Sequence, residues 1–282
     1  MTDRPSLLLD NLVFPEGPRW HKGRLWFSDI HAGEVVAVDE NGQRETIVRV
    51  GAKPSGLGWL PGGDLLVVSM EDRRVLRFDG RELKQHADLS GLAAFSCNDM
   101  VVDGGGRAYV GNFGFDLWGG GEPTTTNLIL VTPDGDASTV ATDMFFPNGP
   151  AITPDGRTLI VGESRGRRLT AFDIEGDGTL SNRRVWADLG VPPDGIALDA
   201  ENCVWVAVPT NPGAFIRVAE GGEVRQRIEV PDAAGYACAL GGADEHTLFM
   251  LEAGSSNPGE IQGPGNGRIR TMSVDVSRAG WP

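Results

Sequence analysis

Residues 61–69 have the sequence Pro-Gly-Gly-Asp-Leu-Leu-Val-Val-Ser, in which a glycine-rich turn leads directly into a short apolar strand. A turn followed by such a strand returns along the chain at intervals of roughly 40 to 50 residues, a spacing typical of propellers and other repeat folds. The strands align at residues 26–29, 66–69, 109–112, 160–163, 205–208 and 249–252, and their matching positions share apolar character. Six copies of one unit therefore fit the 282 residues.

Each unit supplies further strands. Residues 34–39, 74–79 and 168–173 alternate between apolar and polar side chains, as half-buried strands do. Residues 45–48 and 183–186 supply a fourth, outer strand. Four-stranded sheets repeated around an axis form a propeller, whereas a β-sandwich or an irregular barrel does not predict six equivalent units. We therefore predict an all-β, six-bladed β-propeller with four-stranded antiparallel blades, as a single domain over residues 1–282.

The net charge of −14 restricts the possible partners. Because an acidic surface is repelled by phosphate backbones and anionic lipids, we expect neither nucleic acid nor a membrane as a partner. Cys97, Cys203 and Cys238 are too few and too scattered for a disulfide framework or a cysteine-based zinc site. Residues 1–11 lack the basic and apolar regions of a signal peptide. We expect a cytoplasmic protein that is a monomer or a weak homo-oligomer.

Polar residues recur at one position of the repeat. In aligned units, the residue just before the first strand is Glu16, Ser55, Asn98, Asn148, Asp194 and, approximately, Ala237. In a propeller these positions face one another around the axis, so two carboxylates and two amides could direct oxygen atoms at one point. Asn148-Gly149 and Asp194-Gly195 are also ordinary turn dipeptides. The shared position nevertheless favours a metal site in a central metal-binding channel.

The predicted ligands are Glu16, Asn98, Asn148 and Asp194. Carboxylate and amide oxygens suit hard divalent cations. Calcium is the first candidate and magnesium, manganese or zinc are alternatives, although no histidine or cysteine at these positions indicates a dedicated zinc site. Two glycine-rich loops, 113–127 and 253–267, interrupt the repeat, and the aromatic residues of the first suggest that it covers a pocket.

Four motifs resemble those of one known family. The segment 14–20, Phe-Pro-Glu-Gly-Pro-Arg-Trp, together with Asn98-Asp99, the segment 146–149 and the segment 193–197, is similar to the senescence marker protein, gluconolactonase and luciferin-regenerating enzyme family. The resemblance extends from about Leu12 to the terminal segment. It implies a six-bladed propeller whose metal is held by Glu16, Asn148 and Asp194, with Asn98 reaching the metal or the bound substrate.

The sequence departs from sugar-lactone members of this family. They carry an arginine two residues before the asparagine that matches Asn98, where this chain has Ser96, and a glutamate in the segment that corresponds to 111–116. With Phe113, Phe115, Trp118, Phe145 and Phe146 around the pocket mouth, we expect a less polar lactone or an aryl ester rather than an aldonolactone. The expected substrate-binding residues are Asn98, Asn112, Phe113 and Asp116.

The resulting functional hypothesis is metal-dependent hydrolysis of a small lactone or ester, with Asp194 as general base. Asp99 could support the site or cap its strand. Cys97 is a poor nucleophile candidate, because no histidine shares its position in the repeat to activate it. Two alternatives remain open: a different carbonyl reaction at the same metal, and a propeller that binds calcium or another ligand without catalysis.

Overall fold

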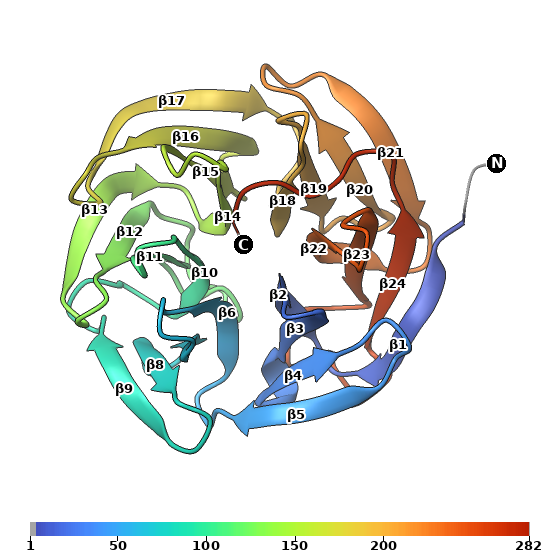
Figure 1. The fold of residues 1–282 in the computed structure, drawn as a ribbon, viewed down its shortest axis with the longest axis horizontal. Coiled ribbons are helices and arrows are strands. Elements are labelled where there is room, and N and C mark those ends of the chain that lie inside the picture. Colours follow the sequence, from blue (N-terminus) through green and yellow to red (C-terminus); the bar gives the residue numbers. More distant parts are fainter. Residues whose placement is uncertain (1–3, 282) are drawn as a thin grey trace.

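The computed structural model describes residues 4–281, which form six four-stranded antiparallel sheets around a central axis (Figure 1). From the axis outward, the first three blades are β2 (Pro15–His21), β3 (Arg24–Asp29), β4 (Glu34–Val38) and β5 (Arg44–Arg49); β6 (Pro54–Trp59), β7 (Leu65–Ser69), β8 (Arg74–Phe78) and β9 (Leu83–Asp88); and β10 (Cys97–Val102), β11 (Ala108–Asn112), β12 (Thr126–Val131) and β13 (Ala137–Met144). The next two are β14 (Pro147–Ile152), β15 (Thr158–Glu163), β16 (Arg168–Ile174) and β17 (Leu180–Asp188); and β18 (Ile196–Leu198), β19 (Val204–Val208), β20 (Gly213–Val218) and β21 (Val224–Val230). The predicted all-β, six-bladed propeller with four-stranded antiparallel blades is confirmed.

The sixth blade combines the two ends of the chain. Its three inner strands are β22 (Ala234–Gly241), β23 (Thr247–Ala253) and β24 (Gly267–Ser273), and its outer strand is β1 (Ser6–Leu12). β1 pairs antiparallel with β24. The ring is thus closed by backbone hydrogen bonds between segments more than 250 residues apart.

Burial decreases from the axis outward because each inner strand packs between neighbouring blades. Every residue of β10 and β14 is buried, whereas β5 has no fully buried residue. The inner strands approach one another so closely that side chains are excluded at some positions. A Cβ atom at Gly56 would lie 2.3 Å from the Met100 nitrogen, and one at Gly149 would lie 2.6 Å from the Gly195 Cα. Glycine is therefore required where these blades meet.

A bulge recurs near the start of the inner strands. The pairing of the first strand with the second shifts between Glu16 and Arg19, and it shifts at the corresponding places in β6, β10, β14 and β22. A bulge adds one unpaired residue and re-aims the neighbouring side chains. The side chains next to it therefore turn toward the axis at one end of the channel.

Helical structure contributes little. The described residues contain one 3-10 turn, η1 (Ile30–Ala32), which follows β3. None of the helical structure in residues 4–281 has the length and hydrophobicity needed to cross a membrane.

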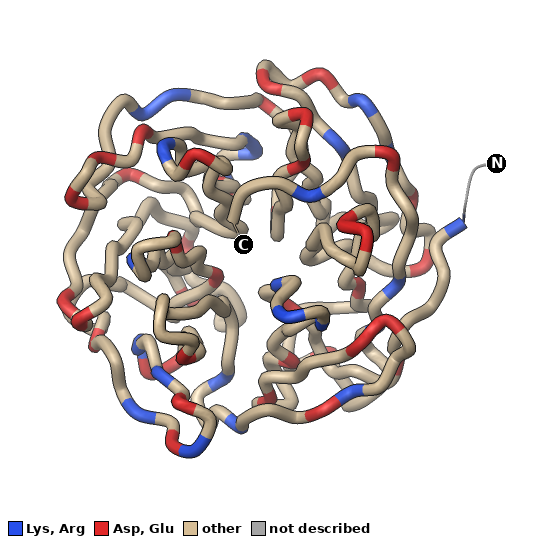
Figure 2. Tube along the Cα trace, in the orientation of Figure 1, with Lys and Arg blue, Asp and Glu red and all other residues tan. Residues whose placement is uncertain are grey.

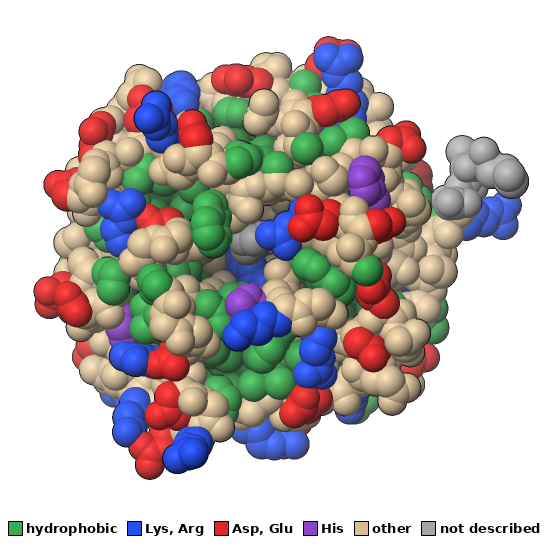
Figure 3. All heavy atoms as spheres, in the orientation of Figure 1, with side chains coloured by type: hydrophobic (Ala, Val, Ile, Leu, Met, Phe, Trp, Pro, Cys, Tyr) green, Lys and Arg blue, Asp and Glu red, His purple; other side chains and the backbone are tan. Residues whose placement is uncertain are grey.

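The other end of the channel is covered by the C-terminal segment. Trp281 forms a bridge to Ile152, and Arg278 forms a bridge to Asp199. Figure 1 shows this segment passing over the centre of the ring, and Figure 3 shows apolar side chains around the central hollow on the same face. A cavity of 240 Å³ lies against this C-terminal segment, and residues at the ends of β2 and β6 contribute to its lining.

His21 in this cavity gives a pH-dependent prediction. Its ring stacks on Trp59 with 3.8 Å between centroids, and burial, assisted by Lys22 and Arg278, lowers its pKa to about 4. The unfolded chain, with a histidine pKa of about 6.5, binds the proton first. The contribution of neutral His21 to the free energy of unfolding is therefore fully present above about pH 6.5. It is lost as the pH falls toward 4, by at most ~1.4 kcal/mol per pH unit.

His21→Phe keeps an aromatic ring against Trp59 and removes the titration. We expect the variant to lose less stability than the wild type between pH 6.5 and 4.5 in urea unfolding. Equal losses in both proteins would show that His21 does not titrate as its environment implies.

Candidate active site

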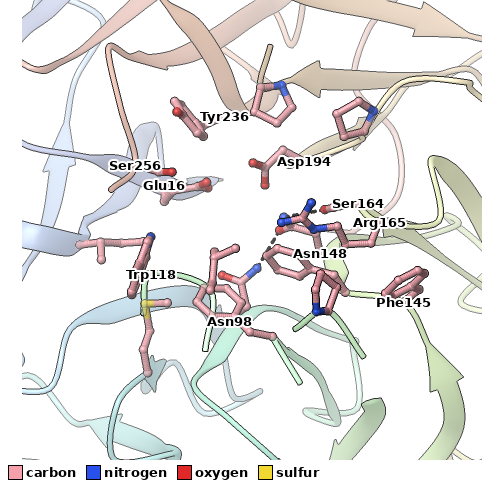
Figure 4. Close-up of a pocket in the computed structure, with 18 of the residues that line it drawn as sticks. Glu16, Asn98, Trp118, Phe145, Asn148, Ser164, Arg165, Asp194, Tyr236 and Ser256 are labelled. Carbon is pink, nitrogen blue, oxygen red and sulfur yellow. Dashed lines mark hydrogen bonds between the residues drawn. The ribbon is translucent and has the colours of Figure 1, made fainter. Parts of the chain in front are cut away.

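The end of the channel where the inner strands begin opens into a cavity of 490 Å³. Its floor carries Glu16, Asn98, Asn148 and Asp194, whose side chains come from four blades and point toward a common centre (Figure 4). Its wall is largely aromatic and contains Phe14, Phe113, Trp118, Phe145, Phe146 and Tyr236. The structure thus brings together all four residues that the sequence predicted as metal ligands.

The backbone explains why these four side chains meet. Glu16, Asn98 and Asn148 are the second residues of β2, β10 and β14, beside the recurrent bulge, whereas Asp194 precedes β18. The predicted register is therefore correct, although three of the four residues lie inside the strand rather than before it.

In the sixth blade, the repeat position predicted from the sequence is wrong by one residue. Gly235 pairs with Glu252 as Pro147 pairs with Glu163. The counterpart of Asn148 is therefore Tyr236, which lines the cavity, and not Ala237.

Hydrogen bonds fix the two amides of the floor. The Asn98 Nδ2 donates to the Asn148 Oδ1 at 2.9 Å, and the Asn148 Nδ2 donates to the Ser164 Oγ at 3.1 Å. The Ser164 hydroxyl in turn donates to the Pro193 carbonyl at 2.7 Å. A chain of hydrogen bonds thus links three blades, and it holds both amides in place before any ligand binds.

The two floor carboxylates have no cationic partner among residues 4–281. Burial raises the pKa of Glu16 well above its usual value, and the charges of Asp194 and Asp99 raise it further. Burial likewise raises the pKa of Asp194, followed by the charge of Asp99, while hydrogen bonds from Asn148 and the Gly195 N–H lower it. Two mutually repelling carboxylates therefore lie in a site that favours the arrival of positive charge.

Asp99 lies in a buried ion pair. The Arg19 Nη2 contacts the Asp99 Oδ1 at 2.8 Å, and both side chains are almost fully buried. Arg19 also donates to the carbonyls of Leu57 and Pro18, at 3.1 and 2.7 Å, and to that of Met100. Asp99 does not line the cavity. Arg19 therefore balances the charge of Asp99 and leaves Glu16 and Asp194 uncompensated.

The floor has the composition of a site for a hard cation. The described residues contain no group of three or more histidine, cysteine, aspartate or glutamate side chains placed to hold one ion. A cation at this point would need the Asn98 and Asn148 oxygens in addition to the two carboxylates. Because buried carboxylates without a partner are costly, and because oxygen ligands suit calcium, magnesium and manganese, the four residues fit such an ion.

Only one of the three other predicted substrate-binding residues lies at the cavity. Phe113 lines the cavity, as predicted, but Asn112 and Asp116 do not. Asn112 is fully buried, where its Nδ2 donates to the Asn127 carbonyl and its Oδ1 accepts a bond from Thr126. Asp116 is exposed and accepts a bond from the Gly119 N–H. Both therefore shape the loop that carries Phe113.

The predicted aromatic surround is largely present. Trp118, Phe145 and Phe146 line the cavity, whereas Phe115 packs behind Phe146 with ring centroids 6.0 Å apart. The Trp118 Nε1 is buried without a hydrogen-bond partner in residues 4–281. This donor is therefore unpaired within the described residues but shielded from solvent.

Cys97 is buried, and burial raises the pKa of its thiol to about 12. The thiolate, which is the nucleophilic form, is thus disfavoured at neutral pH.

Sequence reasoning missed several residues of the cavity. Ser164, Arg165 and Arg167 form the turn between β15 and β16, and all three line the cavity. A signal was present, because this turn follows the repeated strand 160–163 and must lie at the end of the blade where the inner strand begins. Ser96 does not line the cavity, and its carbonyl accepts the Phe113 N–H at 3.0 Å.

Comparisons with known proteins identify the family and the fold. Residues 14–254 match the SMP-30/Gluconolactonase/LRE-like region. Pentonolactonase XacC of Haloferax volcanii is 27% identical over 95% of this chain and 92% of its own length. The 6-deoxy-6-sulfogluconolactonase of Pseudomonas putida is 24% identical over 96% of this chain and 94% of its own length. The calcium-binding protein regucalcin from Agrobacterium tumefaciens shares the fold, with a TM-score of 0.80 and 22% identity over 99% of this chain and 96% of that chain.

Proposed function

Because this chain belongs to the SMP-30/gluconolactonase/LRE-like family, we propose that it hydrolyses a small-molecule lactone at the floor of the 490 Å³ cavity. The observation that carries the proposal is the convergence of two unpaired carboxylates and two fixed amides beneath an aromatic wall; Asp194 is buried and Glu16 is partly buried. The names of two relatives, a pentonolactonase and a sulfogluconolactonase, support the lactone as the substrate class.

We further propose that one divalent cation is held by Glu16, Asn98, Asn148 and Asp194. Calcium is the first candidate, supported by the oxygen ligands and by the calcium-binding relative, and magnesium, manganese or zinc are alternatives. When bound, the cation would polarise the lactone carbonyl and make a nearby water more acidic.

Side chains of the cavity transfer the proton and orient the substrate. Asp194 takes a proton from the attacking water, whose oxygen forms a bond to the lactone carbonyl carbon. When the bond from that carbon to the ring oxygen breaks, Asp194 returns the proton to the leaving alkoxide. Asn98 orients the substrate, and the Trp118 side chain contributes to the wall against which it packs. The aromatic wall limits the access of water to this step.

The cavity also supports a substrate ring with fewer hydroxyl groups than an aldonolactone. Phe14, Phe113, Phe145 and Phe146 offer apolar contacts to such a ring. No arginine stands at position 96, and Ser96 does not line the cavity. The aromatic wall therefore favours apolar contact over hydroxyl recognition.

A panel of sugar, aliphatic and aryl lactones tests the proposal. Initial rates are followed with a pH indicator, using chelated protein refilled separately with calcium, magnesium, manganese or zinc. We expect metal-dependent hydrolysis of at least one lactone. Metal binding without any turnover would favour a binding propeller, and turnover of other carbonyl compounds alone would favour a different reaction.

Metal addition gives a prediction that is independent of activity. We expect calcium at about 100 times its dissociation constant to stabilise the folded protein by ~2.7 kcal/mol, because the ion relieves repulsion between Glu16 and Asp194. The measurement is thermal unfolding of chelated protein with and without calcium. Asp194→Asn should reduce the shift, whereas Asp134→Asn, in an exposed turn, should retain it. Equal shifts in both variants would place the ion elsewhere.

A further inference from the structure

Two arginines at the mouth of the cavity have no acidic or hydrogen-bonding partner for their side chains in the described part of the chain. Arg165 and Arg167 both line the cavity, and both side chains are exposed. Within residues 4–281, neither forms a salt bridge or a side-chain hydrogen bond to the protein. Figure 4 shows the Arg165 side chain extending toward the centre of the cavity. The mouth, defined by these two arginines, thus presents free guanidinium groups.

Free arginines are unexpected on this acidic chain, which has 39 acidic and 25 basic residues, spread over all blades (Figure 2). Glu163 is the carboxylate nearest to the turn in sequence, but Arg168 and Arg183 already pair with it at 2.9 and 3.3 Å. Glu163 also accepts bonds from Thr170 and the Phe145 N–H. Glu163 therefore already has its partners, and Arg165 and Arg167 form no ion pair with it.

The turn that carries the two arginines is held firmly. The Arg165 N–H donates to the Phe145 carbonyl at 3.2 Å, and the Arg167 carbonyl accepts the Leu189 N–H at 2.9 Å. The Arg165 guanidinium lies 5.7 Å from the centroid of the Phe115 ring. Contact with an aromatic face leaves the N–H groups of a guanidinium free to donate. Arg165 is thus partly oriented before a ligand arrives.

The chemistry of these groups indicates their ligand. A guanidinium binds carboxylate, sulfonate or phosphate oxygens through paired, charge-assisted hydrogen bonds. The proposed function places the reacting carbonyl at the floor, beside Glu16 and Asp194, so an anionic group of the same ligand must lie elsewhere in the cavity. Asp194 is only 8% exposed, whereas both arginines are exposed, so the floor and the mouth lie at different depths. A ligand with its reactive group at the floor could place an anionic group at the mouth.

We propose that the substrate is a lactone with an anionic substituent, and that Arg165 and Arg167 recognise this substituent at the mouth while the ring contacts the aromatic wall. This inference rests on the proposed lactone hydrolysis. It makes the two arginines specificity-determining residues, since they touch the substrate but not the reacting atoms.

Matched lactones test the inference. The substrates are γ-butyrolactone and its 5-carboxylate derivative, which differ in a single anionic group. We expect the wild type to prefer the carboxylated lactone, and Arg165→Ala/Arg167→Ala to reduce the ratio of kcat/KM values by about 10- to 100-fold, mainly through KM. Arg81→Ala/Arg157→Ala removes the same charge from exposed turns and should leave the ratio unchanged. An unchanged ratio in the mouth variant overturns the inference.

A binding arm separates this inference from the proposed function. Absence of hydrolysis with every lactone and metal would overturn the proposed function alone. Calorimetry of the metal-loaded protein then compares cyclopentanecarboxylate with the neutral cyclopentanecarboxamide, and uses cyclopentanesulfonate and cyclopentyl phosphate to identify the preferred anion. Tighter binding of an anion that is lost in Arg165→Ala/Arg167→Ala supports the inference. Equal affinities for the anions and the amide, or binding that the substitutions leave unchanged, overturn it.

Discussion

Asp194→Asn is expected to lower kcat for lactone hydrolysis by about 100- to 10,000-fold, the range typical of losing a general base. Asparagine preserves the size of the side chain but cannot accept the proton of the attacking water. Because Asp194 is also a proposed metal ligand, the measurement is kcat at saturating metal, with metal content determined in the same samples.

The control for this experiment is Asp134→Asn, which makes the same chemical change in an exposed turn. It should retain wild-type turnover. If metal-loaded Asp194→Asn keeps more than a tenth of the wild-type kcat, another group accepts the proton, and the role of Asp194 is limited to binding.

Arg19→Met is expected to destabilise the protein by about 3–5 kcal/mol, because it leaves the buried Asp99 carboxylate without its partner. The same change removes the hydrogen bonds from Arg19 to three backbone carbonyls. The measurement is urea unfolding of chelated protein, so that a change in metal binding does not contribute.

Two further variants identify the cause of this loss. Arg227→Met breaks the exposed pair of Arg227 with Glu229 and should cost no more than about 1 kcal/mol. Adding Asp99→Asn to Arg19→Met should recover part of the stability, because the uncompensated charge is then absent. If the double variant is no more stable than Arg19→Met, lost packing and hydrogen bonds account for the effect, and the ion pair does not.

The fold was largely predictable because each blade repeats the same local pattern. Turns such as residues 61–64 lead into buried strands at a regular interval, and this interval sets the number of blades. The closure of the ring was not predicted. β1 pairs with β24, a contact between distant segments, and β1 lacks the turn and strand pattern that marks the repeat.

The floor of the cavity was predictable for the same reason, since Glu16, Asn98, Asn148 and Asp194 share one repeat position. The bulge in the inner strands was not visible in the sequence, because it depends on how two strands pair. Because of this bulge, the residue of the sixth blade that lines the cavity is Tyr236, one position before the expected Ala237.

The mouth of the cavity was the least predictable part. Asn112 was expected to contact substrate, but it is fully buried beside Thr126, and Asp116 is exposed outside the cavity. Arg165 and Arg167 line the mouth instead. Loop side chains are placed by tertiary contacts such as those of Phe145 and Phe115, and no sequence period describes these contacts.

The most direct measurement is the rate of lactone hydrolysis as calcium is titrated into chelated protein, with bound calcium counted in parallel. We predict that the rate rises in proportion to bound calcium, reaches a plateau at one ion per chain, and stays near zero throughout for Asp194→Asn. A rate independent of bound metal, or a plateau that Asp194→Asn shares, would contradict hydrolysis at a single cation held by Glu16, Asn98, Asn148 and Asp194.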